Sequence, residues 1–257
     1  MSDKTTLRGI PFSKINDSIV TFLKEKIKEK RAVIGLSGGI DSSLTAFFLS
    51  KAIDRSKILG LILPDSTSTP PEDIRDSINL ANMLGIEWKL IYIDEIVSSY
   101  TKKFNSYDKR SLGNLKARIR MSILYFFAND LDALVVGTGD KSEIYLGYFT
   151  KYGDGGVDIL PIGDLYKTEV RETAAYFGLP KDIVLKKSSP RLWPGQTAED
   201  ELGLTYEEAD KILYEYLDLR TDKNELLMKY GDLAKRVLEL IENSEHKRSL
   251  PPIPKIL

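Results

Sequence analysis

The residues best suited to chemistry in this chain begin in the segment Ile34–Ser43, where Gly38 and Gly39 lie between serines and Asp41 follows. Glycines let a backbone approach an anion closely, and the serine hydroxyls add hydrogen-bond donors. A carboxylate beside a phosphate is repulsive unless a cation lies between them. Asp41 therefore predicts Mg²⁺ that bridges the protein to a polyphosphate.

The elements around this segment must present it to a ligand. An apolar run, 32–36, predicts a buried strand, and the apolar-rich stretch 44–53 predicts a helix. A strand, a glycine turn and a helix start with free N–H groups together form an anion site. No Gly-Lys-Ser/Thr follows the glycines, so the segment is not a Walker A loop. The alternative is an ordinary strand-turn-helix corner capped by an aspartate.

The run Ser37-Gly38-Gly39-Ile40-Asp41-Ser42 resembles the pyrophosphate loop of the N-type ATP pyrophosphatases. That resemblance implies an adenine nucleotide alpha hydrolase-like fold and cleavage of ATP between its α- and β-phosphates. An oxygen of an acceptor is adenylated, and a nucleophile then displaces AMP. The loop by itself does not identify the acceptor.

A second dense segment, 137–158, continues into 161–168 and carries many glycines, aromatic residues and charges. Its Gly-Tyr-Phe-Thr-Lys-Tyr-Gly-Asp-Gly and Pro-Ile-Gly-Asp-Leu-Tyr-Lys-Thr stretches resemble those of the ammonia-dependent NAD synthetases. Segments 113–121, 192–197 and 245–248 also match, so the resemblance spans roughly residues 15 to 252. It implies that ATP activates the carboxyl of deamido-NAD (nicotinic acid adenine dinucleotide), and that ammonia converts it to NAD with release of AMP and pyrophosphate.

The resemblance also implies roles for individual residues. Catalytic roles fall on Asp41 and Lys167, and Mg²⁺ is expected on Asp41 and Glu143. The residues expected to bind ATP are Gly35, Leu36, Ser37, Gly38, Gly39, Ile40, Asp41, Ser42, Thr138, Lys167 and Ser189. Those expected to bind deamido-NAD are Arg118, Lys151, Asp158, His246 and Lys247.

Structural alternatives stand beside these assignments. Lys167 could be a solvated helix end, and Arg118 could form a structural salt bridge. Lys151 and Asp158 bracket a glycine-rich turn and could pair with each other. His246, the single histidine, could be a helix cap or a surface residue.

The chain departs from the family pattern at two places. In the family, a loop expected to act as a lid over the site commonly reads Pro-Ser-Ala-Gly-Leu-Trp. The corresponding residues 188–193 of this chain read Ser-Ser-Pro-Arg-Leu-Trp. The hydroxyl of Ser189 is retained, but Pro190 and Arg191 change the stiffness and the charge of the lid. Asp140 stands where many relatives have Asn.

Composition narrows the function classes. The net charge of −1 and the pI of about 6.0 give no basic field for nucleic acid. The apolar runs fall far short of the ~18 residues of a membrane span, and no signal pattern opens the chain. We therefore expect a soluble cytoplasmic protein that binds neither nucleic acid nor membrane.

The chain has no cysteine, which excludes disulfides, thiolate metal sites and a cysteine nucleophile. Domains that hydrolyse glutamine to supply nitrogen use such a cysteine, so the nitrogen for an amidation must arrive as free ammonia or from another chain.

The 257 residues suit a single α/β domain, 1–257, with C-terminal helices. Strands are expected at 32–36, 57–63, 87–93 and 133–136, and helices at 15–27, 42–53, 71–84, 94–104, 112–129 and 166–177. This alternation predicts a doubly wound parallel sheet flanked by helices, with ligands at the carboxyl ends of its strands. Residues 188–195 predict a long loop within a lid, 186–204, and two helices follow near 205–217 and 231–244.

The stretch 119–128 is apolar nearly all round, which is typical of a helix buried in a core or in a subunit contact. The family resemblance implies a homodimer with the dinucleotide site across the interface. Two rival functions remain open at this point. One is another amide- or amine-forming ATP pyrophosphatase, such as a GMP synthase-type domain, and the other is a nucleotide-binding sensor without turnover.

Overall fold

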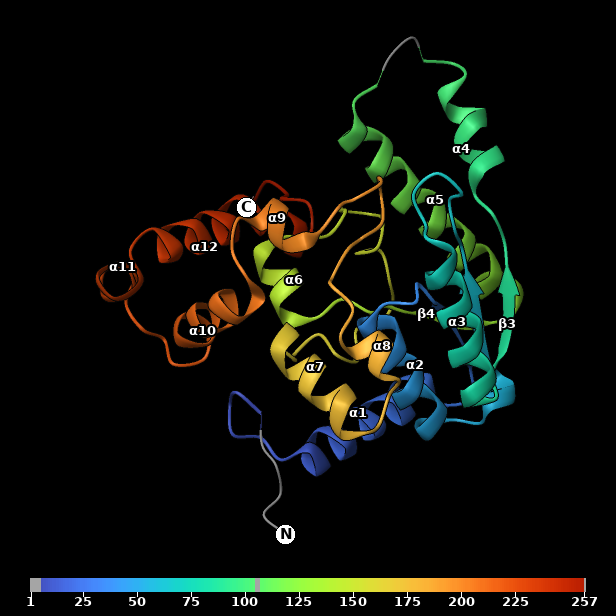
Figure 1. The fold of residues 1–257 in the computed structure, drawn as a ribbon, viewed down its shortest axis with the longest axis horizontal. Helices are drawn as coiled ribbons and strands as arrows, with labels where there is room; N and C mark the ends of the chain where they lie inside the picture. The colour runs from blue at the N-terminus through green and yellow to red at the C-terminus, as the bar shows by residue number, and fades with distance from the viewer. Residues whose placement is uncertain (1–5, 105–106, 257) are drawn as a thin grey trace.

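The computed structural model describes residues 6–104 and 107–256 and contains one four-stranded parallel sheet (Figure 1). The strand order is β3 (Glu87–Leu90), β2 (Ile58–Ile62), β1 (Arg31–Gly35) and β4 (Ala133–Val136). In the centre of the sheet, Val33 of β1 is in register with Leu59 of β2 and Val135 of β4. The predicted parallel sheet flanked by helices is confirmed.

The strand residues alternate between two hydrophobic cores, because successive side chains of a strand point to opposite faces. Ala32 and Ile34 pack in one core with α1 (Phe12–Ile27), α2 (Ile40–Ala52) and α3 (Pro71–Leu84). Val33 and Leu61 pack in the other core, against α4 (Asp94–Thr101) and α5 (Lys109–Asp130). Helices thus cover both faces of the sheet.

The strand order reverses at β1, because β2 and β3 lie on one side of it and β4, the last strand of the chain, lies on the other side at the edge of the sheet. β1 leads into α2 on one face of the sheet, whereas its neighbour β4 packs against α5 on the other face. Such a reversal of strand order opens a crevice at the carboxyl ends of the strands, where ligands bind in open α/β sheets. The phosphate-loop candidate and the segment after β4 meet at this crevice.

The C-terminal helices form a third core. Leu202, Tyr206, Ile212 and Val237 are buried together with Leu146. They belong to α9 (Ala198–Leu202), α10 (Tyr206–Leu217) and α12 (Asp232–Asn243), which pack on α6 (Lys141–Leu146) and near α7 (Lys167–Tyr176). Figure 1 shows α10, α11 (Lys223–Tyr230) and α12 together on one side of the molecule, away from β3 and α3. This core holds the elements that follow β4.

The sequence prediction missed the short helices α6, α8 (Lys181–Val184), α9, α11 and α13 (Glu245–Arg248). Apolar periodicity is weak in segments of four to eight residues, and here the caps carry the signal instead. Asp140 and Glu143 form a reciprocal capping box on α6, and Asp222 caps α11. The predicted strand 87–93 is also too long, because regular pairing ends at Leu90. No helix among the described residues is long and apolar enough to cross a bilayer.

Candidate active site

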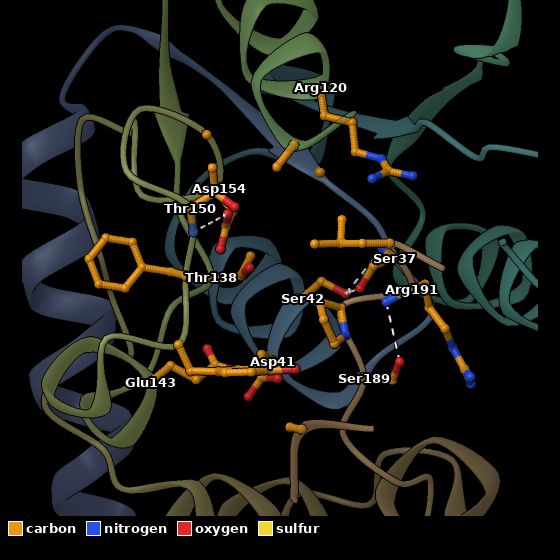
Figure 2. A pocket seen from close by; sticks show the side chains of 18 of the residues that line it. Ser37, Asp41, Ser42, Arg120, Thr138, Glu143, Thr150, Asp154, Ser189 and Arg191 are labelled. Carbon is orange, nitrogen blue, oxygen red and sulfur yellow. Dashed lines mark hydrogen bonds between the residues drawn. The ribbon is translucent and has the colours of Figure 1, made fainter. Parts of the chain in front are cut away.

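A cavity of about 630 Å³ lies at the carboxyl ends of the strands. Its walls come from the loop after β1, the end of β4, the 143–154 segment, α5 and the lid residues 188–193. Figure 2 shows side chains of these segments pointing toward one another across the cavity, including Ser37, Thr138, Glu143 and Ser189. Segments more than a hundred residues apart in the sequence therefore share one site.

The loop after β1 has the geometry of an anion cradle. Gly38 has a φ of +71°, and a Cβ placed there would lie 2.3 Å from the carbonyl oxygen of Asp73. Only glycine fits this position, since it needs both a left-handed backbone and close packing. Ser37 Oγ lies 3.0 Å from Ser42 Oγ, and the latter also donates to the carbonyl of Gly39 at 3.1 Å. The first turn of α2 follows without a side-chain cap, which leaves N–H groups for a ligand.

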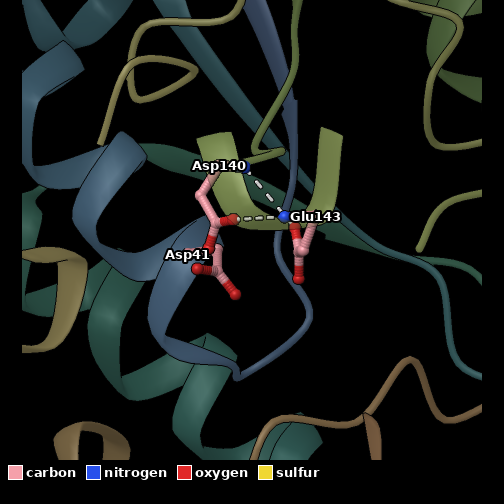
Figure 3. A group of neighbouring side chains, drawn as sticks. All are labelled: Asp41, Asp140 and Glu143. Atoms are coloured by element: carbon pink, nitrogen blue, oxygen red, sulfur yellow. Dashed lines mark hydrogen bonds between the residues drawn. The ribbon is translucent and has the colours of Figure 1, made fainter. Parts of the chain in front are cut away.

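Beneath the loop, one buried ammonium holds three carboxylates together. Lys167 Nζ lies 2.7 Å from Asp41 Oδ2 and 2.8 Å from both Asp140 Oδ2 and Glu143 Oε1. The side chains of Lys167 and Asp140 are fully buried, whereas about one fifth of Asp41 and of Glu143 remains exposed. Figure 3 shows the three carboxylates converging from the start of α2 and from α6. A solvated helix end is therefore the wrong reading of Lys167.

Burial and charge shift the pKa values of this cluster. Burial raises the pKa of Asp140 to about 7, although the Lys167 ammonium acts in the opposite direction. Burial likewise raises the pKa of Glu143. For Lys167, desolvation alone would lower the pKa, but the three carboxylates outweigh it and hold the pKa above its ordinary value. Lys167 is therefore a cation at neutral pH.

The donor set fits a hard divalent cation. One oxygen from each of Asp41, Asp140 and Glu143 lies within 4.8 Å of the others. Among the described residues, the buried Oδ1 of Asp41 has no hydrogen-bond partner. A buried carboxylate oxygen without a partner is costly, and Mg²⁺ prefers such oxygen ligands. Asp41 Oδ1 is therefore a candidate ligand atom for such a cation.

The structure brings most of the residues expected at the ATP site to this cavity. The residues of this set that line the cavity are Gly35, Leu36, Ser37, Asp41, Ser42, Thr138 and Ser189, and the expected metal ligand Glu143 lines it too. Gly38, Gly39 and Ile40 complete the loop and the start of α2 beside them, and Lys167 lies directly behind Asp41 and Glu143. The binding roles of these residues stay predictions.

The residues expected at the dinucleotide site lie elsewhere, with Lys247 as the exception that lines the cavity. Arg118 is exposed on α5 and donates to the carbonyl of Lys151 at 3.3 Å. Lys151 Nζ in turn donates to the carbonyl of the exposed His246 at 2.5 Å. These three residues form one linked group on the outer surface, on the α5 side of the cavity wall.

Asp158 has a different setting. Its carboxylate accepts hydrogen bonds from Val135 N at 2.7 Å and from the Tyr125 hydroxyl at 3.0 Å. Within the described ranges it forms no ion pair with Lys151, and Arg118 forms none with any acid. The two salt bridges considered for these residues from the sequence are therefore absent.

Two charged residues of the site had no assigned role in the sequence analysis. Asp140 is buried in the Lys167 cluster, and its capping-box spacing to Glu143 is a signal that could have placed it. Arg120 lines the cavity, and its Nε donates to the carbonyl of Leu63 at 2.9 Å (Figure 2). Desolvation lowers the pKa of Arg120, although Asp65 and Asp154 act in the opposite direction. No spacing pattern in the sequence predicts that this side chain of α5 faces the cavity.

A second buried ion pair supports the cavity wall. Lys116 Nζ lies 2.6 Å from Asp65 Oδ2, and both side chains are 4% exposed. Lys116 also reaches Thr67 Oγ1 at 3.4 Å and the carbonyl of Leu192 in the lid at 3.3 Å. Burial alone would raise the pKa of Asp65, but hydrogen bonds from Lys116 and Thr67 outweigh it and lower the pKa. The pair thus ties α5 to the loop after β2 and to the lid.

Replacing Lys116 with Met is expected to lower the free energy of unfolding by about 3 kcal/mol, since the Asp65 carboxylate would stay buried without a partner. Denaturant unfolding at neutral pH measures this loss. The double variant Lys116→Met/Asp65→Asn removes the orphaned charge and should recover a substantial part of it. A single variant as stable as the wild type would show that the pair has no such role.

Comparisons with known proteins agree with this geometry. The family model described as NAD synthase matches residues 14–251. The NH(3)-dependent NAD(+) synthetase of Hyperthermus butylicus is 49% identical over 255 residues, which cover 96% of this chain and 92% of that protein. The enzyme of the same name from Saccharolobus solfataricus is 51% identical over 248 residues, with 92% and 88% covered.

Solved structures give the same result. The NMN synthetase of Francisella tularensis superposes with a TM-score of 0.85 at 33% identity, and covers 96% of this chain and 100% of that one. The NH3-dependent NAD synthetase of Campylobacter jejuni superposes with a TM-score of 0.81 at 31% identity and the same coverage. The likeness therefore extends over the sheet, the cavity and the C-terminal helices alike.

Proposed function

The chain belongs to the NAD synthase family, and from that premise we infer that it uses ATP to amidate deamido-NAD with ammonia. The products are NAD, AMP and pyrophosphate. The observation that carries this conclusion is the match of residues 14–251 to the family model together with near-full-length identity of about one half to two NH(3)-dependent NAD(+) synthetases. A GMP synthase-type function has no comparable support.

We propose that ATP binds with its phosphates on the Ser37–Ser42 loop and the first turn of α2. The serine hydroxyls and the free N–H groups there offer donors to phosphate oxygens. Asp41 and Glu143 would hold Mg²⁺, which when bound neutralises charge on the phosphates and favours departure of pyrophosphate. The partnerless Oδ1 of Asp41 supports this assignment.

Besides holding the three carboxylates together, Lys167 would stabilise negative charge on the phosphates. Its ammonium now balances three carboxylates, and it is buried within reach of the cavity edge at Asp41 and Glu143. With a metal on Asp41 and Glu143, Lys167 would keep Asp140 as its partner and would add positive charge close to the phosphates. A fixed cation that needs no reorganisation stabilises the charge that develops as the α–β bond breaks.

The reaction then runs in two balanced steps. A carboxylate oxygen of deamido-NAD attacks the α-phosphorus, and the bond to the β-phosphate oxygen breaks to release pyrophosphate. Ammonia next attacks the activated carbonyl carbon, AMP leaves with the former carboxylate oxygen, and a proton is lost to give the amide. The substrate carboxylate is already ionised at neutral pH, so the first step requires no general base.

The surface position of Arg118, Lys151 and His246 supports a dinucleotide site that a second subunit completes. A groove between α4 and α5 runs beside Arg118 and is lined by Ile96, Leu115, Ile119, Ile123 and Phe126 among others. Phe126 is 69% exposed, and Tyr100 at the groove edge is 51% exposed. Apolar side chains gathered in this way are typical of an interface, and we propose that two copies of the chain pair through the α4–α5 surface.

Replacing Phe126 with Asp is therefore expected to convert a dimer into a monomer, as measured by light scattering during size-exclusion chromatography, and to raise the KM for deamido-NAD. Met228 on α11 is 82% exposed and lies far from α4 and α5, so Met228→Asp is the matched control (Figure 1). A Phe126→Asp protein that remains dimeric would place the interface elsewhere.

The direct test is NAD formation from deamido-NAD, Mg-ATP and ammonium chloride, with AMP and pyrophosphate quantified alongside. Equal yields of NAD, AMP and pyrophosphate are expected. Nicotinic acid mononucleotide is assayed in parallel because one similar structure is an NMN synthetase, and xanthosine monophosphate tests the GMP synthase-type alternative. ADP and phosphate as products would contradict the phosphate-loop assignment, and no turnover with any acceptor would favour a nucleotide sensor.

A further inference from the structure

Arg191 is the feature of the lid that neither the family resemblance nor the proposed function explains. It is one of the residues that line the cavity, and in Figure 2 its backbone lies beside Ser37 and Ser189 while its side chain extends away from Ser37. Its backbone has a φ of +51°, in the left-handed region that disfavours residues with a Cβ. A costly conformation at a cavity wall persists when the side chain makes a contact that offsets it.

The backbone around Arg191 is held firmly. Its N–H donates to Ser189 Oγ at 3.2 Å, and that hydroxyl donates to the carbonyl of Gln196 at 2.6 Å. The next residue, Leu192, donates its N–H to the side-chain oxygen of Gln196 at 2.9 Å. The lid turn therefore closes on itself and fixes the direction in which the guanidinium leaves the chain.

Asp73 fixes the guanidinium at the phosphate loop. Arg191 Nε lies 2.8 Å from Asp73 Oδ2, and Lys186 Nζ lies 2.8 Å from Asp73 Oδ1. Lys186 also donates to the carbonyl of Gly38 at 2.9 Å and lies 2.5 Å from Asp76 Oδ2. Asp73 is only 2% exposed and packs directly on Gly38. The lid, the start of α3 and the glycine turn thus meet at one point.

Most of the hydrogen-bonding capacity of Arg191 is unused. Among the described residues, only Nε has a partner, and the two terminal amino groups have none. Because Asp73 holds Nε, the remaining N–H groups form a fork whose position is set by the start of α3. A guanidinium fork matches two oxygens of one phosphate group better than an ammonium does.

We propose that Arg191 contacts the pyrophosphate that leaves ATP, with Asp73 as the residue that positions it. The proposal rests on the function proposed above and adds a ligand contact specific to this lid. The terminal amino groups donate to oxygens of the β- and γ-phosphates, while Lys186 keeps the lid joined to the glycine turn. The pyrophosphate group of deamido-NAD carries the same chemistry, so the test must separate the two ligands.

The test is calorimetric titration of the full-length wild type and Arg191→Gly with magnesium pyrophosphate, AMP and deamido-NAD, each alone. Loss of the fork is expected to weaken magnesium pyrophosphate about tenfold and to leave AMP and deamido-NAD unchanged. Arg220 also has a left-handed backbone, with a φ of +59°, and is exposed away from the cavity. Arg220→Gly is therefore the matched control for the backbone change and should bind all three ligands as the wild type does.

Each other outcome would overturn the proposal. Unchanged pyrophosphate binding by Arg191→Gly would remove the contact, weaker deamido-NAD binding would assign the fork to the dinucleotide, and equal weakening of all three ligands would indicate a purely structural lid residue. Should Arg191→Gly fail to fold, Arg191→Lys keeps the charge without the fork and should still bind pyrophosphate more weakly. A wild type that binds pyrophosphate through Arg191 yet forms no NAD would contradict the proposed function but would leave the Arg191 contact standing.

Discussion

Replacing Asp41 with Asn is expected to reduce NAD formation by about a thousandfold while the fold survives. The substitution keeps the size of the side chain but removes the charge that would hold Mg²⁺ at the start of α2. Asp41 is partly exposed and caps no helix, and without its charge Lys167 still has Asp140 and Glu143 as partners, so the fold should survive. Initial rates of AMP and NAD release, with thermal unfolding of the same samples, measure the two effects.

Two further variants serve as comparisons for Asp41→Asn: one changes a second carboxylate of the cluster, and the other is a control. Glu143→Gln should lose activity to a similar degree, since its carboxylate faces the same cluster from α6. Asp130→Asn changes an exposed aspartate at the end of α5 and should keep full activity. Wild-type turnover by Asp41→Asn would rule out its carboxylate as the essential metal ligand.

Lys167→Met should abolish turnover and also lower the free energy of unfolding by about 3–5 kcal/mol. The fully buried ammonium balances Asp41, Asp140 and Glu143, and methionine fills its volume without its charge. Three carboxylates within a few ångströms would then repel one another in a poorly solvated site. Denaturant unfolding in the presence of a chelator measures the loss of stability.

A comparison with and without Mg²⁺ distinguishes a structural role of Lys167 from the catalytic role proposed for it. Mg²⁺ bound to the native carboxylates, as proposed above, should raise the unfolding temperature of Lys167→Met more than that of the wild type, where the ammonium competes for the same oxygens. Turnover should not return, because the cation beside the phosphates is still missing. Equal stabilisation of both proteins by Mg²⁺ would argue against a shared site, and restored turnover would remove the catalytic role.

The sequence by itself determined the sheet and the glycine turn that joins β1 to α2. Alternation of Ala32, Val33 and Ile34 requires covered faces on both sides of β1, because neighbouring strand residues point in opposite directions. The glycine turn at Gly38 and the helix start at Ile40 are likewise local, set by the conformations a few adjacent residues can adopt. Such features depend on neighbours in the chain and can be predicted without tertiary contacts.

The prediction was incomplete for the short helices and for some residues of the candidate site. Short helices such as α6 and α11 have little apolar periodicity, and their caps were the overlooked signal. The residue roles taken from the family motifs included Lys167, which forms an ion pair with Asp140, but left Asp140 itself without a role. They also gave no sign that Arg118 and Lys151 would lie outside the cavity that holds Ser37 and Asp41.

Only the tertiary structure decided which charges meet. Lys167 and Asp41 are separated by more than a hundred residues, as are Arg191 and Asp73, and each pair forms an ion pair shorter than 3 Å. No local propensity encodes such a meeting. It follows from the packing of α2 and α6 against α7 and from the contact of the lid with α3. Long-range contacts arise when buried surfaces must fit together, and for that reason the residue types indicated the chemistry while the fold fixed the partners.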